Sequence, residues 1–303
     1  MPQLNPFHII CIDWSKHAHK RRIWWRPAGT QSIEPLALEG TNLIDVLEYF
    51  ESEKNPVLVG IDAAIGAPRQ VLTQFSAGER INNAGFFQWM NWLFDYGYPD
   101  EPVTSPEDWH YSRPFIHVPP GKGSKSAFTH YGIPLHRTVE AGLNSNSPLI
   151  VSGIPGTVGS GSRELWRQIW ESKIRQVSNV AVWPYDGELA NLLKNTQFVL
   201  AEIYPKACYG IALSDSLPSP LIALAKTKQP TREKTVQQIL DKYSNTLQIE
   251  NIDQCRNNED DFDAMISTLA LHRLFEHKII LEPKTTACHS EGAVLGKAAL
   301  ILG

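Results

Sequence analysis

The chain has 303 residues and a formal net charge of −4 at pH 7, and 42% of its residues are hydrophobic while 20% are charged. These proportions are typical of a globular protein and exclude a disordered or fibrous chain. Because the chain has no overall basic excess, a nucleic-acid surface would have to be a local patch.

The four cysteines are widely spaced and form no C-x-x-C pair, so they predict neither a zinc site nor a disulfide framework. The first residues, MPQLNPF, lack the basic start and apolar run of a signal peptide. No apolar stretch reaches the length needed to cross a bilayer. We therefore expect a soluble, cytoplasmic protein with no membrane partner.

The N-terminal part reads as β-β-β-α-β. Apolar, β-branched or aromatic runs with turn residues between them predict strands at 7–15, 20–25 and 32–38. Apolar residues at helical spacing predict a helix over 41–53. The nearly continuous apolar run at 56–68 is typical of a central strand covered on both faces.

Residues 69–196 hold most of the Gly and Trp and nearly half of the Pro, and they show a looser pattern. Helices are expected near 79–95 and 163–178, with long loops between them. A loop-rich segment of this size is typical of an insertion that contacts substrate. After it, a strand is expected at 198–205, and helices at 234–244 and 260–277. We therefore expect an α/β fold in one domain, 1–303, carrying this insertion.

Three acids lie within or at the end of predicted buried strands: Asp13 in CIDWS, Asp62 in VGIDAAIG and Glu202 in LAEIYP. A buried carboxylate costs free energy unless it is paired, hydrogen-bonded or bound to a metal. One such acid could simply emerge into solvent at a strand end. Three of them favour a shared role.

A further acidic cluster begins the last predicted helix, in NEDDFDAMISTLAL (258–271). Asp260 and Asp263 are three residues apart and share a helix face, whereas Asp261 is rotated away and is expected to face solvent. The alternative is that these acids only cap the helix and complement its dipole.

If the strand ends and the helix meet, the acids converge. Like charges so placed raise one another's pKa and call for a cation. Carboxylate oxygens favour Mg²⁺ or Mn²⁺. Two such ions would hold the attacking and leaving oxygens of an in-line phosphoryl displacement.

The motifs IDWS, VGIDAAIGAP, AEIYPKACY and DDFDAMISTLAL resemble those of the ribonuclease H-like superfamily. The chain most resembles the domain-of-unknown-function 429 family of predicted nucleases in that superfamily, and its middle segments PFIHVPPGKGS and GTVGSGSRELW are similar to those of the family. The last helix is also similar to that of bacterial Holliday-junction resolvases.

This resemblance implies a ribonuclease H-like mixed sheet of five strands flanked by helices, with a large insertion between the fourth and fifth strands. It also implies a Mg²⁺- or Mn²⁺-dependent nuclease acting on DNA or RNA. The metal ligands would be Asp13, Asp62, Glu202 and Asp263, and Asp260 would support them in the catalytic set.

Two Gly-rich segments, PPGKGSKS (119–126) and GSGSR (159–163), do not match an ATPase phosphate loop. They could form a mobile loop in which Lys122, Lys125 or Arg163 touches a phosphate backbone. An ordinary surface loop is the alternative.

Two further patterns are ambiguous. The basic run from Lys16 to Arg22 could line a groove for nucleic acid, but solvated faces are the simpler interpretation. The Trp-rich segment WMNWLFDYGY could stack nucleobases, but aromatic residues at helical spacing favour a core.

Three functions remain open from the sequence. The leading hypothesis is a metal-dependent nuclease. The others are a non-catalytic nucleic-acid or nucleotide-binding module and, less favoured, a phosphotransferase of the sugar-kinase and actin type, which would need two copies of the core. The sequence does not predict an oligomeric state.

Overall fold

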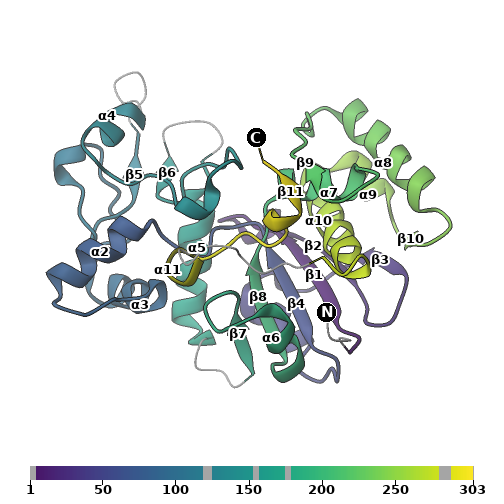
Figure 1. Ribbon diagram of the computed structural model, residues 1–303, viewed down its shortest axis with the longest axis horizontal. Coiled ribbons are helices and arrows are strands. Elements are labelled where there is room, and N and C mark those ends of the chain that lie inside the picture. Colours follow the sequence, from purple (N-terminus) through teal and green to yellow (C-terminus); the bar gives the residue numbers. More distant parts are fainter. Residues whose placement is uncertain (1–4, 119–124, 153–156, 175–178, 280–287, 303) are drawn as a thin grey trace. The chain divides into compact units, whose positions relative to one another are not determined.

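The computed structural model describes residues 5–118, 125–152, 157–174, 179–279 and 288–302 (Figure 1). The chain forms two compact units. The first comprises residues 1–62, 177–284 and 294–303, and the second comprises 63–176 and 285–293. In the described ranges, no helix is both long and apolar enough to cross a membrane.

The first unit is built on a seven-stranded mixed sheet in the order β10-β3-β2-β1-β4-β8-β7. β1 is antiparallel to β2 and β2 to β3, whereas the other neighbours run parallel. The strands are β1 (His8–Asp13), β2 (Arg22–Arg26), β3 (Ser32–Pro35), β4 (Val57–Ile61), β7 (Val180–Val182), β8 (Phe198–Glu202) and β10 (Gln248–Ile249). The five strands predicted from the sequence are the central ones. The expected count of five was too low because the two edge strands, β7 and β10, are too short to leave a hydrophobic pattern.

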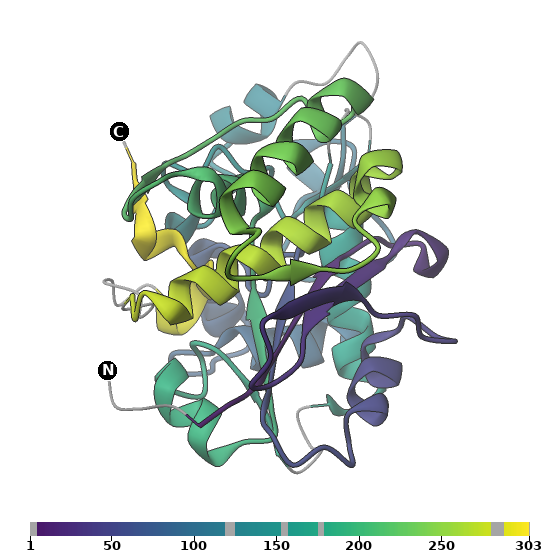
Figure 2. The ribbon, with the colours of Figure 1, turned by 90° about the vertical axis from the view of Figure 1, so that its right-hand side faces the viewer.

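Helices cover both faces of this sheet. They are α1 (Leu43–Tyr49), α6 (Leu189–Asn195), α7 (Pro205–Leu213), α8 (Gln229–Tyr243), α9 (Asp253–Asn257) and α10 (Glu259–Glu276). α10 packs against β1, β2 and α7, and it crosses the sheet as the yellow-green helix of Figure 2. On the opposite face, Phe50 at the end of α1 packs edge-on against Trp25 of β2. A short parallel pair, β9 (Ser219–Pro220) and β11 (Leu300–Ile301), completes the unit.

The start of α10 is fixed by a side-chain cap. The Asn258 side chain accepts hydrogen bonds from the backbone N–H groups of Asp260 (2.7 Å) and Asp261 (3.1 Å). Such a cap satisfies donors that have no partner inside the helix. From Asp261 to Leu274 every residue of α10 is buried. The helix is therefore an internal element of the unit rather than an amphipathic surface helix.

The second unit contains most of the predicted insertion. Its elements are α2 (Arg69–Gly78), α3 (Phe86–Tyr96), β5 (Ile116–His117), α4 (Lys125–His130), β6 (Ile150–Ser152), α5 (Gly159–Glu171) and α11 (Cys288–Glu291). The helix expected near 79–95 is shorter at its start, because Arg80 and Asn83 adopt positive φ angles that end one helix before the next begins. The helix expected near 163–178 begins earlier, at Gly159.

The Trp-rich segment forms core in the second unit. Trp89 of α3 and Trp166 of α5 are fully buried, with ring centroids 5.8 Å apart in an edge-to-face arrangement. The Trp89 indole N–H donates to the carbonyl of Tyr111 at 3.1 Å. The interpretation of the segment as core is confirmed for Trp89, whereas Tyr96 and Tyr98 at its end are exposed.

Candidate acidic site at the carboxyl ends of β1 and β4

Asp13 and Asp62 lie beside each other at the ends of two adjacent parallel strands. Ile12 of β1 is in register with Ile61 of β4, so Asp13 and Asp62 follow at equivalent positions. The backbone N–H of Asp62 donates to the carbonyl of Ile12 at 3.0 Å, which extends the ladder by one residue. Parallel strands end on the same edge of a sheet, and this brings the two carboxylates together.

Both carboxylates belong to the face of the sheet that α10 covers. Side chains alternate along a strand, so Asp13 shares a face with Cys11, and Asp62 with Gly60. A Cβ atom at Gly60 would lie 3.2 Å from Cys11 Sγ and 3.3 Å from Leu271 Cδ1 of α10. Gly60 thus allows α10 to approach β4 closely beside the acids.

Asp263 enters this site from α10 and is fully buried. The hydroxyl of Tyr209 in α7 donates a hydrogen bond to Asp263 Oδ1. The ammonium of Lys226, from the loop before α8, donates to Asp263 Oδ2 and forms an ion pair with it. Both oxygens of Asp263 are therefore engaged.

Asp13 and Asp62 have no such partners. Within the described residues, neither carboxylate takes a hydrogen bond or an ion pair. Burial, together with Asp62 and Asp263, raises the pKa of Asp13 well above its ordinary value. Burial and Asp263 raise the pKa of Asp62 to about 7. Carboxyl groups with raised pKa values either keep a proton or are stabilised by a nearby cation.

Burial also raises the pKa of Asp263, although Lys226 and Tyr209 oppose the shift. Burial alone would lower the pKa of Lys226, but Asp263, Asp13 and Asp62 together raise it above its ordinary value. The ammonium is thus held in its charged form by all three carboxylates.

Glu202 and Asp260 lie at the margin of this group. Glu202 is buried and in register with Ile61, so its side chain leaves β8 on the face opposite to that of Asp62. Its charge still contributes to raising the pKa of Asp62. Asp260 is partly exposed in the first turn of α10 and raises the pKa values of Asp13 and Asp263.

The prediction that Asp261 faces solvent is wrong. Asp261 is buried, accepts a hydrogen bond from the indole N–H of Trp24 at 3.0 Å, and pairs with Arg22 at 3.3 Å. Rotation away from Asp263 directs this side chain onto β2 because the sheet, rather than solvent, lies on that side of α10. Asp261 therefore anchors α10 to the sheet.

The predicted phosphate-contacting residues fall in the second unit. Lys122 lies outside the described residues. Lys125 begins α4 and reaches Asn146 Oδ1 at 3.5 Å. Arg163 donates to the carbonyl of Pro99 at 3.0 Å. The expectation that GSGSR forms a loop is wrong, because these residues make the first turns of α5, and Gly159 packs so closely on Ile150 that a Cβ would lie 2.5 Å from its carbonyl oxygen.

The basic run after β1 divides into two kinds of residue. Lys16 and Lys20 are exposed, as the solvated-face interpretation expects. Arg21 is buried, with its guanidinium 3.9 Å from the Trp14 ring centroid and a hydrogen bond to Asn42 Oδ1 at 2.9 Å. Arg21 is therefore a structural residue.

Sequence reasoning missed Lys226 and Tyr209. Tyr209 lies in the motif AEIYPKACY, one turn into the helix that follows Glu202. Its position on that helix could have indicated that its hydroxyl lies near the acids. Lys226 sits in the loop ALAKTKQP, where nothing local distinguishes it from any exposed lysine. Only the fold brings it to Asp263.

The donor chemistry of the site fits a hard divalent cation, since Asp13 and Asp62 offer unpartnered carboxylate oxygens. The arrangement is not closed around an ion, because among the described residues no three His, Cys, Asp or Glu side chains are grouped to hold a metal. The carboxylate oxygens of Asp263 are bound by Lys226 and Tyr209 instead. Asp13 and Asp62 are therefore the residues that would hold Mg²⁺ or Mn²⁺.

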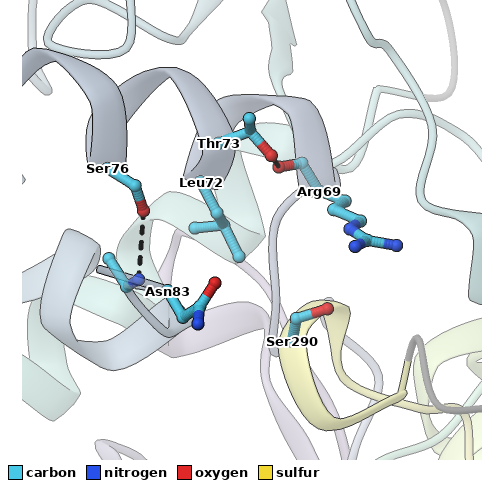
Figure 3. Close-up of a pocket in the computed structure, with 7 residues that line it drawn as sticks. Arg69, Leu72, Thr73, Ser76, Asn83 and Ser290 are labelled. Carbon is cyan, nitrogen blue, oxygen red and sulfur yellow. Dashed lines mark hydrogen bonds between the residues drawn. The ribbon is translucent and has the colours of Figure 1, made fainter. Parts of the chain in front are cut away.

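The second unit has a hollow of its own, of about 300 Å³, beside α2 (Figure 3). Its polar lining comes from Arg69, Thr73, Ser76, Asn83 and Ser290. Among the described residues that line it, none is an acid or a histidine. The acidic site of the first unit is the stronger candidate for chemistry.

No family model, curated protein or solved structure matches this chain.

Proposed function

We propose that the protein is a Mg²⁺- or Mn²⁺-dependent phosphodiesterase that acts on nucleic acid, with a ribonuclease H-like core. The observation that carries this proposal is the pair Asp13 and Asp62, two carboxylates at adjacent parallel strand ends that take no hydrogen bond or ion pair from the part of the chain that the structure describes. The order β3-β2-β1-β4-β8 supports the fold assignment, since it places the first, fourth and fifth predicted strands side by side.

The proposed roles follow from the contacts. Asp13 and Asp62 hold the cation, which when bound polarises a water molecule and a phosphoryl oxygen. Asp263, fixed by Tyr209, orients the Lys226 ammonium beside them. Glu202 and Asp260 add negative charge that strengthens cation binding. These acids act as ligands and charges rather than as proton carriers.

The test is cleavage of labelled RNA, single- and double-stranded DNA, RNA–DNA hybrid and a four-way junction by the full chain, with Mg²⁺, Mn²⁺ or EDTA. We expect metal-dependent cleavage of at least one substrate. Asp62→Asn should lower the rate by at least about 100-fold, because a preorganised charge at the reacting centre is removed.

Asp253→Asn is the matched control, since the Asp253 side chain on α9 is 79% exposed and pairs only with Arg256 in the described contacts. It should cleave at the wild-type rate. Cleavage that survives Asp62→Asn would mean that the acidic site does not perform the reaction.

A non-catalytic nucleic-acid or nucleotide-binding module is the second candidate. The engagement of Asp263 by Lys226 favours it, because a cluster neutralised by a lysine can persist without turnover. Binding of a substrate in the same panel, without cleavage under any metal condition, would support this alternative.

A further inference from the structure

We infer that the ammonium of Lys226 fills one of the two cation positions of the acidic site, so that the site accepts a single divalent ion, held by Asp13 and Asp62. The inference rests on the proposed function for its metal and adds a positioning residue to it. It replaces the two-ion arrangement that the sequence suggested.

The three carboxylates differ in the partners that engage them. Asp263 has both oxygens engaged, one by Tyr209 and one by Lys226. Among the described residues, none donates a hydrogen bond to the carboxylate oxygens of Asp13 or Asp62 or forms an ion pair with them. Lys226 therefore supplies one positive charge to the site at Asp263, and Asp13 and Asp62 are the carboxylates that would hold a divalent ion.

The backbone of Lys226 is held in place by Arg232. The buried guanidinium of Arg232 donates to the carbonyl of Lys226 at 2.6 Å. The same group donates to the carbonyls of Arg256 (3.1 Å) and Asn257 (3.3 Å), which directly precede the cap of α10. Arg232 thus ties the loop that carries Lys226 to the end of α9, immediately before α10.

The ion pair between Lys226 and Asp263 also opposes the binding of a second divalent ion. Asp13, Asp62 and Asp263 all stabilise the charged form of Lys226. A second divalent ion at Asp263 would have to break an ion pair with a fully buried carboxylate and leave the ammonium beside it. A retained ammonium beside one metal ion balances the three carboxylates with three positive charges.

The experiment counts bound Mn²⁺ per chain by equilibrium dialysis and electron paramagnetic resonance, using the full-length protein freed of metal. We expect one site in the wild type and in Lys226→Arg, which keeps the charge. We expect a second site in Lys226→Met. Lys228→Met, at an exposed position two residues further along, should bind one ion.

Thermal unfolding in EDTA supplies the second readout. Lys226→Met should lose at least about 4 °C in Tm, because Asp263 loses its buried counter-charge, while Lys228→Met keeps the wild-type Tm. If Lys226→Met folds poorly, the number of ions bound by the wild type still tests the inference, because that measurement uses no variant.

Two bound ions in the wild type would overturn the inference, as would an unchanged Tm and ion count in Lys226→Met, or no bound ion in any variant. These results are distinct from failure of the proposed function. If the protein binds one ion and cleaves no substrate, the inference about Lys226 stands and the proposed nuclease activity is wrong. If the protein cleaves a substrate and binds two ions, the nuclease activity stands and the inference about Lys226 is wrong.

Discussion

Asp261 and Asp263 are two residues apart on α10, and the fold gives them different tasks. Asp263 faces the strand-end acids and holds Lys226, while Asp261 holds Trp24 and Arg22 of β2. One carboxylate belongs to the candidate site and the other to the packing of the helix. Neighbouring acids in one short motif therefore should respond differently to substitution.

Asp261→Ala tests this division. It removes the acceptor of the fully buried Trp24 indole, and a buried donor without a partner costs about 1–3 kcal/mol. We expect a loss of that size in the free energy of unfolding, measured by urea denaturation. Asp261→Asn, which keeps an oxygen acceptor, should lose less.

Asp253→Ala provides the matched control for this measurement. Its surface pair with Arg256 should contribute less than about 1 kcal/mol. Wild-type stability in Asp261→Ala would show that the contact with Trp24 does not anchor α10.

At the scale of elements, the sequence predicted the strands that carry the acids and missed the loop whose Lys226 pairs with Asp263. β1, β4 and β8 were visible because continuous apolar runs end in Asp13, Asp62 and Glu202. The exposure of Asp261 was misjudged because helical periodicity gives only the direction of a side chain. It does not say whether solvent or a sheet lies in that direction.

The loop before α8 could not be predicted, because its place depends on contacts between residues far apart in the chain. Arg232 connects Lys226 to the carbonyls of Arg256 and Asn257. Such a connection leaves no local pattern of polarity or spacing. Lys226 therefore looks like a surface lysine in the sequence and forms part of the site in the fold.

Arg232→Ala should disturb two elements at once. It leaves three carbonyl acceptors without their donor and opens a cavity, so we expect a loss of about 2–4 kcal/mol in the free energy of unfolding. Arg232→Lys should also lose stability, because an ammonium cannot reproduce the planar fork of a guanidinium.

Lys234→Ala, at an exposed position of the same helix, is the control and should remain within about 0.5 kcal/mol of the wild type. Chemical denaturation followed by circular dichroism measures all three variants. An Arg232→Ala protein as stable as the Lys234→Ala protein would contradict the role assigned to Arg232.

At the scale of the whole molecule, two groups give the stability opposite dependences on pH. Burial, with a contribution from Arg26, lowers the pKa of His272 to about 4, below its ordinary value of 6.5. The unfolded chain then takes up this proton first, so stability falls as pH falls from about 6.5 to 4. Asp62, with its pKa raised to about 7, keeps a proton in the folded state that the unfolded chain has lost, so its contribution falls as pH rises from about 4 to 7.

Asp62→Asn should remove the second effect and leave the first. We expect this variant to gain about 1–3 kcal/mol over the wild type near pH 7 and little near pH 4, as measured by urea denaturation across this range. Asp253→Asn should follow the wild type. Parallel pH profiles for Asp62→Asn and the wild type would show that Asp62 is not destabilising. A gain would show that the site is maintained at a cost to stability, as is common for functional sites.

The order of the strands also has a consequence for the growing chain. β4 ends at Ile61, but its parallel neighbour β8 begins only at Phe198, after the main part of the second unit has been made. During synthesis, the apolar β4 would present an unpaired edge until β8 emerges, and such edges promote aggregation. Closing this pair requires a loop of more than 130 residues, and the entropy of loop closure makes such long-range pairing slow. The pairing of β4 with β8 is therefore the step at which the sheet that carries the acids is most exposed to aggregation.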